Sequence, residues 1–165
     1  MFLDDKGGYR KDSGIIMKIF IGADHRGFKL KQKVIKFLNA KKYDVIDVGT
    51  YVEGKPCDYP LISKRVAQAV VKTKGARGIL VCMTGIGNSI AANKVCGIRA
   101  ALCYNAKAAY FSRAHNDANV LVVGSKFVKG QDIFRIVTTW LNAKFEGGRH
   151  LRRVNQIKKI EKECC

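Results

Sequence analysis

Acidic residues, proline and tryptophan are scarce in this sequence of 165 residues. It has 13 Asp plus Glu against 31 Lys plus Arg, with two prolines and one tryptophan. So little proline, with no repetitive tract, excludes a fibrous or linker-rich protein. No apolar run approaches the ~18 residues of a membrane span, and the N-terminus lacks the cationic and apolar blocks of a signal peptide. We therefore expect no membrane partner and a cytoplasmic location.

Metal-binding cysteine patterns are also absent. The six cysteines include no C-x-x-C pair, and none joins a histidine in a zinc-type spacing. In a cytoplasmic chain the expected state is the reduced thiol, most often as a small core side chain. The sequence therefore predicts no metal site.

The excess of positive charge is the most distinctive global feature. The formal net charge is +18 at pH 7, which suits nucleic acid, an acidic membrane or a phosphorylated metabolite as a partner. Residues 26–42 hold seven basic residues and no acidic one, but the sequence contains no helix-turn-helix, zinc-finger or RNP signature. We interpret this stretch as a solvated basic face and keep a nucleic-acid partner as the less favoured alternative.

Apolar runs of strand length alternate with segments of helical period. The runs occur at Lys18–Ala23, Tyr43–Val48, Arg77–Met83, Ile98–Cys103 and Asn119–Gly124. Apolar stripes of helical spacing lie at residues 30–38, 62–70 and 133–141. Strands joined through helices make right-handed crossovers and a parallel sheet. The pattern predicts a single domain with a Rossmann-like, three-layer α/β/α fold and a five-stranded parallel sheet.

The two ends of the chain differ from this pattern. Residues 1–16 carry no periodicity, and we predict a disordered extension there, followed by the domain over residues 17–165. Residues 149–163 form a basic tail with apolar residues at three-residue spacing, namely Leu151, Val154, Ile157 and Ile160. One isolated apolar stripe needs a partner surface, either in its own domain or on another subunit.

Ligands of parallel sheets bind in the loops at the carboxyl ends of the strands. The loop after the third predicted strand contains Gly85 and Gly87 and precedes a predicted helix at Ser89–Lys94. Such glycines expose successive N–H groups and form an anion-binding concavity. A dinucleotide site is disfavoured, because it needs an acidic residue ~20 positions downstream and the sequence has none there.

Several side chains in these regions carry candidate chemistry. Cys82 is either a buried strand-end cysteine or a base or nucleophile, whose thiolate a helix N-terminus and a basic field favour. His25 follows the first strand, where a ligand is expected. Arg149 and Arg153 are four residues apart on one helical face, so they are either solvated or able to grip one phosphate together.

Seven short motifs that occur in order along the chain point to a particular protein family. They are Gly22–Gly27, Asp58–Pro60, Cys82–Gly87, Ser89–Lys94, Gly97–Ala100, Arg113–Asp117 and Glu146–His150. Together they closely resemble type B ribose-5-phosphate isomerase, whose superfamily includes galactose-6-phosphate isomerase subunits, over roughly residues 17–162. The resemblance implies an aldose–ketose isomerase without metal or cofactor that interconverts D-ribose 5-phosphate and D-ribulose 5-phosphate.

The resemblance also implies roles for individual residues. Cys82 would move a proton between C2 and C1, and His115 would assist opening of the furanose ring with Asp24 nearby. The loop at residues 83–87, with Thr84, would stabilise the enediolate oxygen. The residues implied to bind substrate are Asp24, His25, Met83, Thr84, Gly85, Ile86, Gly87, Asn116, Lys126, Arg149 and Arg153. The site would lie at the interface of a homodimer, with a tetramer as the larger alternative.

The sequence departs from the family pattern at two positions of the implied site. Met83 replaces a glycine that is common after the cysteine, which narrows the pocket. Lys126 replaces an arginine, so the charge is retained without the bidentate fork. Asn88 stands about where relatives without the cysteine have a carboxylate, so this chain belongs with the cysteine type. A six-carbon substrate, allose 6-phosphate or galactose 6-phosphate, is the alternative to the pentose.

Overall fold

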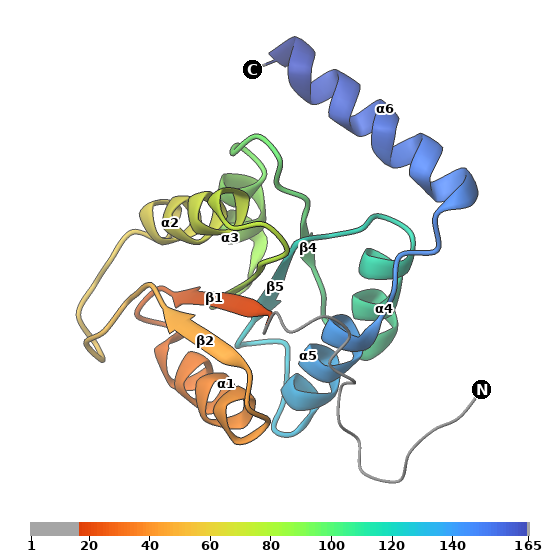
Figure 1. Cartoon of the computed structure of the whole chain (residues 1–165). Helices are drawn as coiled ribbons and strands as arrows, with labels where there is room; N and C mark the ends of the chain where they lie inside the picture. The colour runs from red at the N-terminus through yellow and green to blue at the C-terminus, as the bar shows by residue number, and fades with distance from the viewer. Residues whose placement is uncertain (1–16, 165) are drawn as a thin grey trace, which may run out of the picture.

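The computed structural model describes residues 17–164. The extension predicted at residues 1–16 lies outside the described residues. Strands and helices alternate along the rest of the chain, and two helices follow the last strand (Figure 1). The elements are β1 (Lys18–Ala23), α1 (Phe28–Ala40), β2 (Asp44–Asp47), α2 (Tyr59–Lys72), β3 (Arg77–Cys82), α3 (Ile86–Ala92), β4 (Ala100–Leu102), α4 (Ala106–Ala114), β5 (Val120–Gly124), α5 (Asp132–Asn142) and α6 (Gly148–Cys164).

The five strands form one parallel sheet, as the sequence predicted, and their order is β2-β1-β3-β5-β4. From β1 the chain goes out to β2 at one edge and then crosses to β3 on the other side of β1. The loops that follow β1 and β3 therefore diverge and leave a crevice between them. Asp24 follows β1 and Cys82 ends β3, so both residues lie at this crevice.

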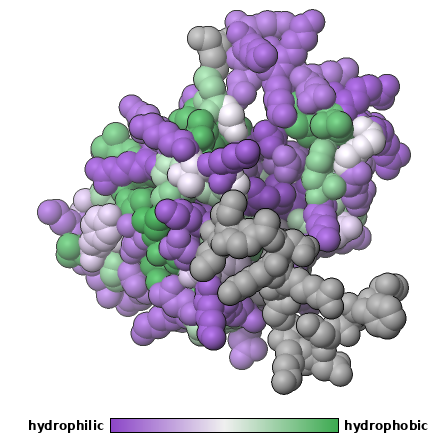
Figure 2. Space-filling model, viewed as in Figure 1, coloured by the Kyte–Doolittle hydropathy of each residue, from purple (hydrophilic) through white to green (hydrophobic). Residues whose placement is uncertain are grey.

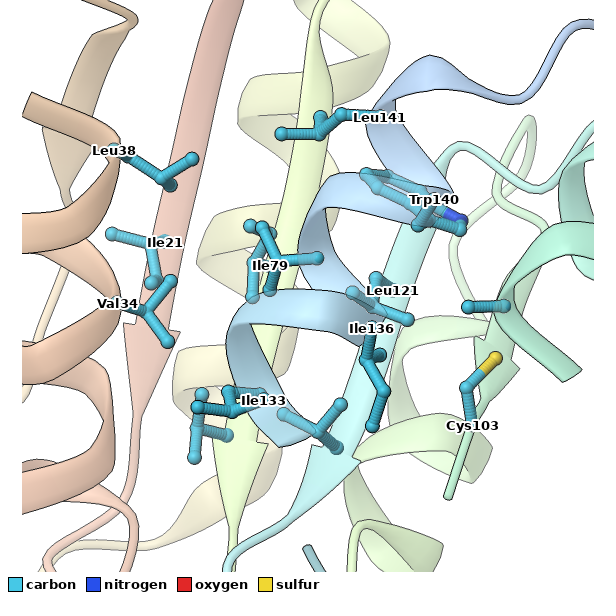
Figure 3. Packing of buried hydrophobic residues seen from close by; sticks show 14 of the residues in the cluster. Ile21, Val34, Leu38, Ile79, Cys103, Leu121, Ile133, Ile136, Trp140 and Leu141 are labelled. Carbon is cyan, nitrogen blue, oxygen red and sulfur yellow. The ribbon is translucent and has the colours of Figure 1, made fainter. Parts of the chain in front are cut away.

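Apolar side chains fill both faces of the sheet. One cluster lies between the sheet and helices α1 and α5 (Figure 3) and includes Val34, Leu38, Ile133, Ile136 and Trp140. The second cluster lies on the α2 side and includes Ile62, Val66 and Val70. β3 contributes Ile79 and Val81 to the first cluster and Leu80 to the second, because side chains alternate across a strand. The predicted three-layer arrangement is confirmed.

Two helices differ from the sequence prediction. α4 was not predicted, because its alanine-rich sequence has only a weak apolar stripe. Its start signal is Asn105, whose side chain accepts a hydrogen bond from the Ala108 N–H at 2.8 Å. α3 begins at Ile86, ahead of the predicted start at Ser89, because Gly85 with φ of 85° is its N-cap.

The C-terminal helix α6 extends from the sheet as an arm (Figure 1), and hydrophilic residues dominate its surface (Figure 2). Of the apolar stripe predicted in this tail, only Val154 is buried, whereas Ile160 is 61% exposed. The Glu161 carboxylate ties the arm to the body by accepting a hydrogen bond from the Gly97 N–H at 2.7 Å. A groove of about 600 Å³ lies beside the arm and is lined in part by Ile98, Ile157 and Ile160. Most of the stripe is thus left uncovered by the described residues.

The cysteines are not all in the predicted state. Cys57, Cys82 and Cys103 are free thiols, but Cys96 is disulfide-bonded, so the prediction of reduced cysteines is wrong at Cys96. Among residues 17–164, no helix combines the length and the apolar character that a membrane span requires.

Candidate active site

A pocket of about 410 Å³ opens at the crevice between β1 and β3. Its lining comes from the loops after these strands and from the start of α2, and consists of Asp24, His25, Arg26, Cys57, Asp58, Tyr59, Cys82, Met83, Thr84 and Gly87. Six of the site residues implied by the resemblance therefore share one pocket. Gly85 and Ile86, which belong to the same loop, complete the turn next to it.

The loop after β1 holds a buried carboxylate. Asp24 is 7% exposed, and its Oδ1 accepts a hydrogen bond from the Gly27 N–H at 2.8 Å. Position 27 requires glycine, because a Cβ there would overlap the backbone of Val81 in β3. This close approach of α1 to β3 fixes Asp24 near Cys82, whose pKa the carboxylate raises.

His25 is oriented by the loop that precedes α2. Its Nδ1 accepts a hydrogen bond from the Cys57 backbone N–H at 3.4 Å. A neutral imidazole that accepts at Nδ1 carries its proton on Nε2. His25 therefore keeps an N–H donor, as a phosphate oxygen requires. The same contact makes the segment before α2 a wall of the pocket.

The turn after β3 is built around the sulfur of Cys82. This side chain is buried, and its Sγ accepts a hydrogen bond from the Gly85 N–H at 3.0 Å. Gly85 has φ of +85°, and a Cβ there would meet the Leu102 side chain and the backbone that ends β5. The turn that aims this amide at the sulfur therefore depends on glycine.

Opposing effects act on the Cys82 thiol. Burial raises its pKa above the ordinary value, and the Asp24 carboxylate raises it further, whereas the N–H groups of Gly85, Thr84 and Asn88 lower it. The burial of the side chain and the net rise in its pKa agree with the buried strand-end cysteine, one of the two alternatives that the sequence left open, and not with a favoured thiolate. Desolvation of the buried sulfur outweighs the amides at the start of the short helix α3. The predicted glycine turn is present, and its N–H groups favour the anionic form of the Cys82 sulfur. That this turn also binds an anion of the substrate stays a prediction.

Two further contacts bring cationic residues to this end of the sheet. The Arg26 Nη1 donates to the Met83 Sδ at 2.9 Å. The Lys126 backbone N–H, beyond the end of β5, donates to the Met83 carbonyl at 3.0 Å. Lys126 thus lies next to the turn after β3, with an exposed side chain.

The other implied site residues lie at the opposite end of the sheet. α4 starts after the carboxyl end of β4 and runs back, so its C-cap His115 precedes the amino end of β5. Gly78, near the start of β3, pairs with Val120, and Cys82 at its end pairs with Gly124. Four residues of strand span about 13 Å. One copy of the chain therefore does not bring His115 and Cys82 into the same pocket.

His115 instead forms a cluster with the start of α6. The His115 and His150 rings stack with centroids 4.0 Å apart and planes 8° apart. The Nε2 of each ring lies 3.6 Å from the same oxygen, Oε2 of Glu146. Arg149 Nε donates to His150 Nε2 at 3.4 Å, and the charge of Arg153 contributes to the lowered pKa of His150. Two implied phosphate ligands therefore lie close to His115.

The cluster contains groups that commonly bind metals. The ligand atoms of His115, Glu146 and His150 lie within 4.8 Å of one another. However, parallel rings direct their nitrogen lone pairs side by side rather than toward one point, and Arg149 already donates to His150 Nε2. The arrangement of these three side chains suits a network of ion pairs and hydrogen bonds better than it suits a metal site. That the chain needs no metal stays a prediction.

Sequence reasoning gave no role to several of these residues. Asp58, Tyr59, Glu146 and His150 belong to the recognised motifs, but their spacing says nothing about what they contact. Arg26 belongs to the Gly22–Gly27 motif but was given no role, and Cys57 belongs to none of the motifs. Their places in the pocket depend on the path of the two loops, which only the folded chain shows.

The class of the protein follows from comparison with known proteins. A family model described as ribose/galactose isomerase matches residues 19–157, and the chain belongs to this family. Ribose-5-phosphate isomerase B of Escherichia coli is 46% identical over 144 residues, which are 87% of this chain and 96% of that protein. The structure of ribose-5-phosphate isomerase B from Clostridium thermocellum has a TM-score of 0.88 at 50% identity, covering 90% of this chain and all of that one. The Mycoplasma genitalium enzyme, with bound ribulose-5-phosphate, has a TM-score of 0.81 at 40% identity, over 89% of this chain and 97% of that one.

Proposed function

We propose that the chain interconverts D-ribose 5-phosphate and D-ribulose 5-phosphate, as do its relatives by their names. The observation that carries this proposal is the pocket in which the buried Cys82 thiol lies near a buried carboxylate, Asp24, and a donor imidazole, His25. These groups match the needs of the reaction, which are a base, a second proton acceptor and a phosphate ligand. The expected location is the cytoplasm.

The isomerisation moves a proton between neighbouring carbons. Cys82, as thiolate, takes the proton from C2 of the open-chain aldose, and the electron pair passes through C1 to the carbonyl oxygen as an enediolate forms. The thiol then returns the proton to C1, while the hydroxyl proton of O2 passes to O1 and the ketone forms at C2. The turn at residues 83–87, with Thr84, stabilises the oxygen on which charge develops.

Ring opening must precede this step. The bond between C1 and the ring oxygen breaks, and its electron pair stays on that oxygen, which takes up a proton. The C1 hydroxyl loses its proton and becomes the carbonyl. We assign the proton donor to His115, as imidazolium, and the proton acceptor to Asp24.

A complete site on this plan needs two copies of the chain. Asp24, His25, Cys82 and Lys126 come from one end of the sheet, and the cluster with His115, Asn116, Arg149 and Arg153 comes from the other end. The exposed apolar residues of α6, Leu151, Ile157 and Ile160, offer a contact surface for the second copy. A homodimer in which each copy supplies one half completes two sites, and a tetramer would pair two such dimers.

Subunit mixing tests this arrangement. Cys82→Ala and His115→Ala variants should each be nearly inactive, whereas a mixture exchanged after partial unfolding should recover about a quarter of wild-type activity, because half of the dimers are mixed and carry one intact site. A mixture that stays as inactive as its components would contradict a shared site. Mixing two different Cys82 variants, Cys82→Ala and Cys82→Ser, is the matched control.

The proposed preference for a five-carbon over a six-carbon sugar phosphate depends on the size of the pocket. Met83 replaces a smaller residue, and its sulfur is held by Arg26 at the lining, which favours a five-carbon sugar phosphate. Turnover of ribose 5-phosphate, allose 6-phosphate and galactose 6-phosphate should be compared directly. Preference for the pentose is expected, and absence of pentose turnover would overturn the proposed function.

A further inference from the structure

We propose that Glu146 and His150 form a positioning pair that couples the orientation of His115 to that of Arg149. This inference rests on the proposed function, in which His115 opens the sugar ring and Arg149 holds the phosphate. Neither Glu146 nor His150 is among the residues that line the Cys82 pocket. The contacts of both residues with the His115 ring, and of His150 with Arg149, are the route by which they act on the reaction.

Glu146 is held at the end of α4 by two contacts that leave one oxygen for the imidazoles. Its backbone N–H donates to the Ala114 carbonyl at 3.0 Å. The Tyr110 hydroxyl donates to its Oε1 at 3.3 Å. The other oxygen, Oε2, lies 3.6 Å from His115 Nε2 and from His150 Nε2. A carboxylate fixed in this way orients the His115 ring, as a carboxylate beside a catalytic imidazole does.

The plane of the His115 ring is set by its aromatic neighbours. It stacks on His150 at 4.0 Å and contacts Phe111 at 4.7 Å between ring centroids. The His150 side chain is 7% exposed and the His115 side chain 33% exposed. The buried His150 ring thus supports the His115 ring, which is exposed enough to contact a substrate.

His150 also holds Arg149, and this contact requires an uncharged ring. Burial lowers the pKa of His150, and the charges of His115, Arg149 and Arg153 lower it further, against the opposing effect of Glu146. A neutral His150 offers the lone pair of Nε2 to the Arg149 Nε–H, at 3.4 Å. Protonation would remove that acceptor and set a positive ring against His115. One neutral imidazole therefore joins the residue for ring opening to a residue for phosphate binding.

Kinetics on matched variants test this pairing. Glu146→Gln should lower turnover of ribose 5-phosphate at least tenfold more than it lowers deuterium exchange from D₂O into C1 of ribulose 5-phosphate, which is an open-chain sugar and needs no ring opening. His150→Phe keeps the ring and loses the acceptor, so KM for both sugar phosphates should rise about tenfold. His150→Gln restores an acceptor at the reach of Nε2 and should recover most of the lost affinity. Equal losses of turnover and exchange in Glu146→Gln, or no rescue by His150→Gln, would overturn the proposal.

Two controls separate this proposal from the proposed function. Glu163→Gln removes one negative charge, as Glu146→Gln does, but at the far end of α6 from His115 and His150. This variant should behave as wild type. The chain has only three histidines, so the His150 ring proton can be followed by NMR as pH is varied. Glu146→Gln should shift the His150 midpoint to lower pH and Arg149→Gln to higher pH, even if the protein isomerises no pentose. An unchanged midpoint in both variants would contradict the network itself.

Discussion

The amide nitrogen of Gly85 lies 3.0 Å from the sulfur of Cys82 and donates a hydrogen bond to it. This amide favours the thiolate, while burial and the Asp24 carboxylate favour the thiol, and the net effect is a raised pKa. In the free pocket Cys82 is therefore a weak acid. A base with a high pKa accepts a carbon-bound proton more readily once it is ionised, and the Gly85 amide is in place for that ionised form.

Removing the charge of Asp24 should make Cys82 more reactive. Asp24→Asn keeps an oxygen for the Gly27 N–H but abolishes the charge that raises the pKa of Cys82. Below its pKa the thiolate fraction grows about tenfold per pH unit, so a lowered pKa means more thiolate at about pH 8. Alkylation of Cys82 by iodoacetamide, followed by peptide mass, should be several-fold faster than in wild type. Slower alkylation would contradict the claim that the Asp24 carboxylate raises the pKa of Cys82. Cys103, with a pKa of about 11 and 1% exposure, is the unreactive internal control.

Glycine at position 85 should be essential for the stability of the fold. Gly85→Ala forces a Cβ toward Leu102 and the backbone near Gly124 at positive φ, and we expect a loss of about 2–4 kcal/mol in the free energy of unfolding. Gly54→Ala is the matched control, since Gly54 also has positive φ but open space around it. It should cost only about 1 kcal/mol. Urea denaturation measures both, and equal losses would refute the steric argument.

The Asp117 carboxylate, close in sequence to His115, forms ion pairs with two arginines. Its carboxylate contacts Arg99 Nη2 at 2.8 Å and Arg113 Nη1 at 2.6 Å, and Arg113 is 5% exposed. Asp117→Asn keeps the backbone geometry of a positive φ, which asparagine tolerates. It leaves a buried cation without its counter-charge, so we expect a loss of about 2–4 kcal/mol. Unchanged thermal denaturation would show that solvent and the Ala118 carbonyl suffice for Arg113.

Lys126 should bind phosphate less well than an arginine would. Its backbone is fixed to the turn after β3 through the Met83 carbonyl, while its ammonium is a point charge. Lys126→Arg restores a bidentate fork, and KM for ribose 5-phosphate should fall about threefold with kcat nearly constant. Lys129→Arg, on an exposed lysine in the following loop, is the control and should change neither constant. A higher KM in Lys126→Arg would exclude this side chain as a phosphate ligand.

The sheet and the first half of the site followed from sequence for one physical reason. Strands of a parallel sheet are buried on both faces, so β1, β3 and β5 are apolar runs, and their carboxyl ends meet at one edge. Because Asp24 follows β1 and Cys82 ends β3, the sequence predicts both at the same edge of the sheet. The sequence did not predict α4, because this helix lacks a strong apolar stripe and only Asn105 marks its start.

The second half of the site could not be derived from local pattern. The distance between His115 and Cys82 depends on the direction of α4, and the stacking of His115 on His150 depends on where α6 begins. The raised pKa of Cys82 could not be derived from local pattern either. Its dominant cause is burial, which is a property of the packed fold, whereas the turn glycines that favour the thiolate are visible in the sequence.

The assay that bears most directly on this account compares wild type with Cys82→Ala. Wild type should convert ribose 5-phosphate to ribulose 5-phosphate. Cys82→Ala should bind the sugar phosphate with nearly unchanged Kd, because the phosphate ligands remain, yet lose at least about a thousandfold in kcat with its proton shuttle. Near-normal turnover by Cys82→Ala would contradict the account, and so would a wild-type protein that leaves the pentose phosphate unchanged.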